Sequence, residues 1–120
     1  MIINLTSSRY IHICTTPTDM RKSFDGLSIR VNDLMSLNPL SGDIFVFFNK
    51  NKTMVKLLVW EKCGFSIYYK RLEQGSFHLP IFETEKVSSH EIDGSELLLI
   101  LEGLELQDSK KYKRFGLKTA

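Results

Sequence analysis

The chain has 120 residues, of which 42% are hydrophobic and 25% charged, and its formal net charge is +2. This length favours one domain, and this composition excludes a wholly disordered chain. No apolar run reaches the roughly 18–20 residues of a membrane-spanning helix, and the first residues lack the basic and apolar regions of a secretory signal. Cys14 and Cys63 do not make a disulfide framework, so we expect free thiols in a reducing cytoplasm.

The first predicted elements are a short strand and a helix. Residues 10–14, YIHIC, are β-branched and aromatic, as is typical of a strand. The sequence PTD from Pro17 resembles a helix start, and from Met20 the apolar residues recur with helical spacing. We therefore expect a helix over 18–36 with one apolar stripe on the core, followed by a turn at 38–43.

A β-meander is predicted next. The sequence IFVFF at 44–48 is apolar at every position, which indicates a strand covered on both faces. The alternating sequences at 54–60 and 65–73 predict two more strands, joined by a tight turn in which Gly64 can adopt a positive φ. We expect FHLP, 77–80, to be a short edge strand that ends at its proline.

One more helix is predicted near the end of the chain. Residues 81–92 are acidic and predicted to be irregular. Asp93 and Glu96 have the spacing of a capping box. The apolar sequence behind them predicts a helix at 94–102 that is largely buried and ends at Gly103.

These elements predict an α+β fold, in which two helices pack against an antiparallel β-meander of four to five strands in near-sequential order. We expect a single domain over residues 1–108. The segment 109–120 has no hydrophobic period and is predicted to be a basic, mobile tail.

The charges are segregated along the chain. Residues 50–71 carry six bases against one acid, a net +5, and residues 109–120 carry five bases and no acid. Between them, residues 83–108 carry eight acids against one lysine, a net −7. Two interpretations remain open: the pattern steers partners electrostatically, or the tail folds back on the acidic segment.

Three sequences in order carry a family resemblance: TDMRKSFDGL at 18–27, FVFFNKNKTMVKLLVWEKCGFSIYYKRLEQGSF at 45–77 and LLLILEG at 97–103. Together they resemble the small second-reading-frame accessory protein, of the transposition protein B type, of the insertion-sequence sixty-six transposon family. The resemblance covers residues 10–106. Cys63 departs from the family, which usually has a polar residue at this turn.

The resemblance implies a bacterial, cytoplasmic protein that is encoded beside a separate transposase and assists DNA transposition without catalysing it. It carries over no catalytic residues, and we predict no enzyme activity, no cofactor and no metal. The partners that it implies are DNA, the cognate transposase and a second copy of the chain, with no membrane.

The residues themselves give little support for catalysis. Two-metal strand transfer needs carboxylates that converge on ions about 3.5–4 Å apart. The candidates share no such spacing; they are Asp19, Asp25, Asp43, Glu61 and Glu73. No histidine stands at a motif spacing from either cysteine, and no paired CxxC or HxxxH predicts a metal site.

Basic side chains on the predicted hairpins and tail are candidates for a nucleic-acid surface, because bases on neighbouring loops and strands can form one patch for phosphates. The candidates are Lys22, Lys50, Lys52, Lys62, Lys70, Arg71, Lys110, Lys111, Lys113 and Arg114. Trp60, Tyr68 and Tyr69 are candidates for stacking on single-stranded bases or for an interface. The alternative is that the lysines are a solvated surface and the aromatic residues belong to the core.

Arg21 and Lys22 are predicted on the first helical turn, where a cation is unfavourable against the helix dipole. Arg21 has the i,i+4 spacing to pair with Asp25, which would be a structural role. For Lys22, a contact with phosphate or with an acidic partner stays an open alternative.

A protein-protein role is the alternative function. If both helices cover one face of the sheet, the apolar residues of 44–48 on the other face would be exposed and mark an interface. We therefore predict an accessory factor that binds DNA, the transposase or both. The alternative is an adaptor or homodimer without direct DNA contact.

Overall fold

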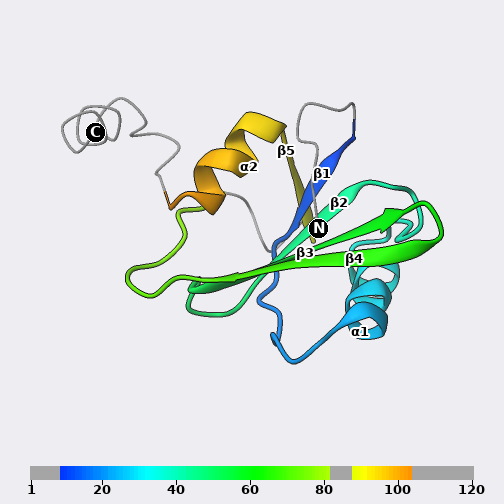
Figure 1. Cartoon of the computed structure of the whole chain (residues 1–120), viewed down its shortest axis with the longest axis horizontal. Coiled ribbons are helices and arrows are strands. Elements are labelled where there is room, and N and C mark those ends of the chain that lie inside the picture. Colours follow the sequence, from blue (N-terminus) through cyan, green and yellow to red (C-terminus); the bar gives the residue numbers. More distant parts are fainter. Residues whose placement is uncertain (1–8, 82–87, 104–120) are drawn as a thin grey trace.

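The computed structural model describes residues 9–81 and 88–103, and its centre is a five-stranded sheet with a helix on each face (Figure 1). The spatial order of the strands is β4-β3-β2-β1-β5. The elements in chain order are β1 (Ile11–Cys14), α1 (Phe24–Ile29), the π-helix η1 (Arg30–Leu34), β2 (Ile44–Phe48), β3 (Met54–Glu61), β4 (Gly64–Arg71), β5 (Ser89–Ile92) and α2 (Gly94–Leu101). The predicted α+β fold and its strand number are confirmed.

The strands β2, β3 and β4 form the predicted antiparallel meander. β1 differs, because it pairs parallel with β2. The chain between these two strands carries α1 across one face of the sheet, and such a crossover returns the next strand in the same direction. In the tight β3–β4 turn, Lys62 adopts the positive φ of 55° that was expected at Gly64.

The fifth strand is not the one that the sequence predicted. Residues 77–80 form no strand; instead Phe77 is buried, and its N–H donates to the carbonyl of Lys52 at 2.7 Å. The fifth strand is β5, which lies in the segment predicted to be irregular and pairs antiparallel with β1. Its sequence, SHEI, carries little strand signal, so its conformation depends on the open edge of β1.

All five residues of β2 are buried because each face of the sheet has its own helix. Ile44, Val46 and Phe48 lie in a cluster with residues of α2. Phe45 and Phe47 lie in a second cluster, with residues of α1 and η1. The prediction of a strand covered on both faces is confirmed, and the exposed apolar patch that would follow from two helices on one face is not formed.

The first helix is shorter than the predicted 18–36, since it begins only at Phe24. The backbone before it is bonded to other elements as well as to itself. The N–H of Thr18 donates to the carbonyl of Phe48 at 2.8 Å. The ammonium of Lys56 donates to the carbonyl of Lys22 at 2.8 Å, and the guanidinium of Arg30 donates to the carbonyl of Pro17 at 3.2 Å. These bonds fix residues 17–23 as an irregular segment.

The second helix has the predicted capping box: the Asp93 carboxylate accepts from the Glu96 N–H at 2.8 Å, and the Glu96 carboxylate accepts from the Asp93 N–H at 3.1 Å. α2 buries Leu97 and Ile100, but Leu98 is 49% exposed, so this helix is less buried than predicted. At its other end the Lys70 ammonium donates to the carbonyl of Leu101 at 2.5 Å. Within the described ranges no helix has the length and hydropathy to span a bilayer.

Substituting Lys56 tests the bond that holds the segment before α1. The Lys56 side chain is only 8% exposed, so Lys56→Met keeps the buried stem and leaves the carbonyl of Lys22 without its donor. A charged hydrogen bond of this kind stabilises by roughly 1.5–3 kcal/mol, and we expect the free energy of unfolding to fall by about that amount. Denaturant unfolding measures it.

Lys50→Met is the matched control, because Lys50 is exposed in the nearby loop and should change stability by less than about 0.5 kcal/mol. If the cost of burying the Lys56 ammonium outweighs its bond, Lys56→Met will be as stable as the wild type, and the proposed role of Lys56 is wrong.

Candidate nucleic-acid interface

The predicted basic residues divide between the two ends of the sheet. The loop 49–53 between β2 and β3 lies beside the end of β4, because Met54 is opposite Arg71 in the β3–β4 pair. We call this end, residues 49–53 and 70–73, the hairpin end; it lies to the left in Figure 1. Lys62 lies in the turn at the other end of β3, eight residues away, which is about 25 Å along a strand.

Lys50, Lys52, Lys70 and Arg71 therefore lie together at the hairpin end, and Lys62 does not join them. Successive side chains of β4 point to opposite faces of the sheet, so Lys70 and Arg71 are separated further. Lys70 is on the face of α2, where it donates to the end of that helix. Arg71 is on the opposite face, where its side chain is 68% exposed and pairs with Glu73 at 3.2 Å.

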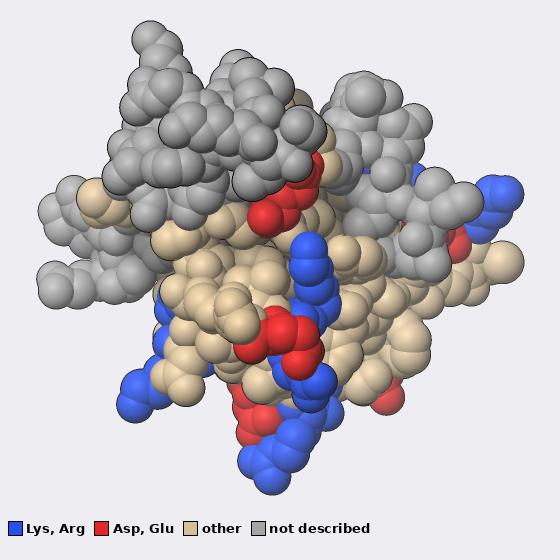
Figure 2. All heavy atoms as spheres, turned by 60° about the vertical axis from the view of Figure 1, so that its left-hand side comes forward, with Lys and Arg blue, Asp and Glu red and all other residues tan. Residues whose placement is uncertain are grey.

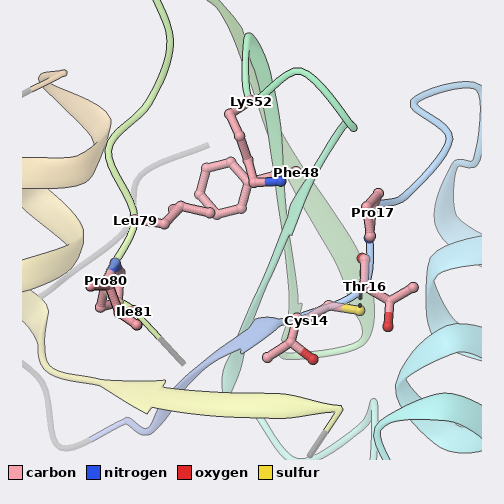
Figure 3. A pocket seen from close by; sticks show the side chains of 9 residues that line it. Cys14, Thr16, Pro17, Phe48, Lys52, Leu79, Pro80 and Ile81 are labelled. Carbon is pink, nitrogen blue, oxygen red and sulfur yellow. Dashed lines mark hydrogen bonds between the residues drawn. The ribbon is translucent and has the colours of Figure 1, made fainter. Parts of the chain in front are cut away.

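Lys52 lies over a hollow between the end of β1 and residues 79–81 (Figure 3). Most of the lining is apolar, with Phe48, Leu79 and Pro80 on one side and Pro17 on the other. The ammonium of Lys52 lies 3.5 Å from the carbonyl of Lys50. One cation beside apolar walls is a poor match for phosphate.

A second hollow gathers charge and an aromatic ring on the α1 face of the hairpin end. It lies between segment 17–21 and loop 49–51, has a volume of about 580 Å³, and includes Met54 and Tyr69 from the strands. Arg21 and Lys50 line it, and Arg71 adjoins it across Tyr69. We call it the Tyr69 groove. Figure 2 brings the left-hand side of Figure 1 forward and shows Lys and Arg side chains, with acidic side chains between them, on the side that it displays.

Arg21 pairs with Asp19 and not with Asp25, so the predicted i,i+4 pair is wrong. The reason is that Arg21 lies before the first residue of α1. Its guanidinium donates to both carboxylate oxygens of Asp19, at 2.7 to 3.1 Å. The side-chain hydrogen bonds from Arg21 lower the pKa of Asp19 from 3.8 to about 2, and the Arg21 N–H, at 2.9 Å, adds to this. The Arg21 side chain is 91% exposed, and such exposed pairs are weak enough to exchange for another anion.

Lys22 has a structural role in part. Its carbonyl accepts the bond from Lys56, and its side-chain stem passes close to α1. A Cβ at Gly26 would lie 3.2 Å from the Lys22 Cβ, so Gly26 permits this approach.

The three candidate aromatic residues occupy different environments. Trp60 packs edge-on against Phe65, with ring centroids 5.0 Å apart, near the end that carries Lys62. Tyr68 packs against the cluster on the α2 face. Only Tyr69 combines high exposure, 52%, with neighbouring cations.

Sequence reasoning missed Lys56, whose ammonium lies 4.7 Å from the centroid of the Tyr69 ring. The signal was present, because Lys56 interrupts the apolar residues of a central strand. The hydroxyl of Tyr69 donates to the sulfur of Met54 at 3.2 Å, so the ring is held at its edge as well as on its inner face.

The other reactive residues do not assemble into a site. In residues 9–81 and 88–103, no three His, Cys, Asp or Glu side chains come together as metal ligands. His12 and Asp43 pair at 3.0 Å, and His12 stacks on Phe45. Cys14 is buried and Cys63 exposed, and both are free. The predicted tail contacts of Lys110, Lys111, Lys113 and Arg114 lie outside the described residues.

Comparison with protein families matches residues 9–111 to the family described as IS66 Orf2 like protein. The chain is 33% identical over 95 residues to uncharacterized protein y4hO of Sinorhizobium fredii (strain NBRC 101917 / NGR234), over 79% of this chain and 80% of that protein. It is 32% identical over 95 residues to uncharacterized protein y4jC of the same strain, over 79% of each. No solved structure matches the chain.

The pKa of Asp19 tests the geometry at the mouth of the Tyr69 groove. In Arg21→Gln the guanidinium bonds are lost while the backbone N–H remains, so we expect the pKa of Asp19 to rise from about 2 towards its ordinary 3.8. At a pH between these two values the carboxylate stays charged in the wild type and becomes largely protonated in the variant. A carbon NMR titration of the side-chain carboxyl measures this.

Asp93 serves as the control in the same titration. Its pKa is lowered by the backbone bond from Glu96 and the side-chain bond from Ser95, neither of which involves Arg21. It should therefore stay unchanged. An unchanged pKa at Asp19 would show that Arg21 does not hold this carboxylate.

Proposed function

The chain belongs to the IS66 Orf2-like family of transposition-associated accessory proteins, and we propose that it assists transposition in the bacterial cytoplasm by binding DNA through the hairpin end. The observation that supports this proposal is the Tyr69 groove, where Arg21 and Lys50 line one hollow with Tyr69 and Arg71 lines an adjoining hollow on the same tyrosine. Strand transfer itself would be left to a separate transposase, with no catalytic residue, cofactor or metal in this chain.

The three cations come from elements that the fold holds in place. Arg21 lies in the segment that is bonded to Phe48, Lys56 and Arg30. Lys50 lies in the β2–β3 loop, and Arg71 ends β4. Each is exposed, and none donates to a buried carbonyl. A phosphate backbone crossing the groove would exchange its counterions for these side chains, which predicts strong dependence on salt.

Lys22, Lys52 and Lys70 contribute less in this proposal. Lys70 is bonded to the end of α2, Lys52 lies over the apolar hollow, and Lys22 is half-buried. Lys62, at the other end of β3, is outside the proposed DNA surface.

A protein contact is the second candidate function, and the exposed residues of α1 favour it. Phe24 is 45% and Ile29 58% exposed, whereas Leu27 of the same helix is buried. The cognate transposase or a second copy of this chain would cover them. Co-purification with the transposase after nuclease treatment tests this: a complex that survives and is weakened by Ile29→Ser would support the contact, and loss of the complex on nuclease treatment would contradict it.

The DNA proposal predicts the response to charge removal. In Lys50→Gln/Arg71→Gln two phosphate contacts are lost, so the slope of log K against log salt should become shallower by roughly two. A mobility shift with element-end DNA over a range of salt concentrations measures the slope.

Lys62→Gln is the matched control, because it removes one exposed charge at the opposite end of the sheet. Its slope and affinity should equal those of the wild type. The proposal fails if the wild type does not bind at low salt, or if Lys62→Gln weakens binding as much as the double variant does.

A further inference from the structure

The Tyr69 groove contains a feature that phosphate binding alone does not require. Duplex DNA presents phosphates outward and keeps the faces of its bases stacked inside. An aromatic ring between cations therefore adds nothing to a contact with the backbone of a duplex. It does add to a contact with a single strand, because every unpaired base has a face that can stack.

The Tyr69 ring is presented for such a contact. Lys56 is 8% exposed and lies on one side of the ring, so that side faces inward. The exposed half of Tyr69 therefore includes the opposite side of the ring. The bond from its hydroxyl to Met54 holds the ring against the sheet, which reduces the freedom that stacking would otherwise remove.

The cations lie in the two hollows to which the ring contributes. Segment 17–21 and loop 49–51 line one hollow with Tyr69, with Arg21 on the first and Lys50 on the second, and Arg71, two residues further along β4, lines the other. A single strand whose base lies on the ring would place its flanking phosphates towards these side chains. Stacking platforms bordered by positive charge are the usual arrangement in proteins that bind single strands without sequence preference.

We propose that the Tyr69 groove binds an unpaired nucleotide of single-stranded DNA, with the base stacked on the outer face of Tyr69 and the flanking phosphates on Arg21, Lys50 and Arg71. This inference rests on the proposed function and makes it more specific. The partner is a single strand, such as a melted or cleaved element end, and not an intact duplex.

The test compares one sequence of about 12 nucleotides, within the usual site size of such platforms, as a single strand and as a duplex. Fluorescence anisotropy at low salt gives both affinities for the full chain. The wild type should bind the single strand more tightly. Tyr69→Leu should weaken single-strand binding about 5- to 150-fold and leave duplex binding unchanged, whereas Tyr69→Phe should keep most of the affinity.

Tyr10→Leu is the control, because Tyr10 is 60% exposed and lies just before β1, where its carbonyl bonds the first residue of β2 far from the hairpin end. It should bind like the wild type. A 2-aminopurine base in the single strand gives a second readout: its fluorescence should be quenched by the wild type and by Tyr69→Phe, and not by Tyr69→Leu. Unfolding curves verify that each variant is folded.

The outcomes separate the two proposals. If single strand and duplex bind equally, or if Tyr69→Leu weakens both alike, stacking on Tyr69 is wrong, while binding that still depends on Lys50 and Arg71 keeps the DNA surface. If neither nucleic acid binds at low salt, both proposals fail.

Discussion

The structure depends on burying β2 on both of its faces. A strand that is apolar at all five positions cannot lie at the surface of a two-layer fold, so one helix must cover each side of it. α1 takes one side and α2 the other, and the chain crosses the sheet between β1 and β2 to achieve this. Once both faces are covered, a partner can reach the outer sides of the helices, the loops and the ends of the strands, but not β2 itself. The Tyr69 groove accordingly lies at the hairpin end.

The long basic side chains serve two purposes, which formal charge does not distinguish. Lys56, Arg30 and Lys70 each donate to a backbone carbonyl of another segment, and so join the segment before α1 and the end of α2 to the rest of the fold. Such bonds are strong because the donor is charged, and they reduce the number of cations available to a phosphate. The net +5 of residues 50–71 therefore overstates the charge of the surface.

The sequence correctly predicted the elements that depend on residues nearby in the chain. The alternation of β3 and β4 and the capping box of Asp93 and Glu96 depend on neighbours in sequence, and both are present. The start of α1 and the strand β5 depend on distant partners, namely the carbonyl of Phe48 and the edge of β1, and both were placed wrongly. The residues of the candidate site divide in the same way, into those predicted from the sequence and those that only the tertiary structure brings in. Tyr69, Lys50 and Arg71 were predicted, whereas the approach of Arg21 to them required the tertiary structure.

Lys56 links the fold to the proposed site. Its ammonium holds the carbonyl of Lys22, which fixes the segment that carries Arg21, and the same ammonium lies against the inner side of Tyr69. Burying the ammonium of a lysine costs free energy unless it has a partner, and here the one ammonium has two partners. The position of the exposed cation and that of the exposed ring are therefore set by one side chain of a central strand. This explains why a lysine stands where the pattern of β3 would otherwise place an apolar residue.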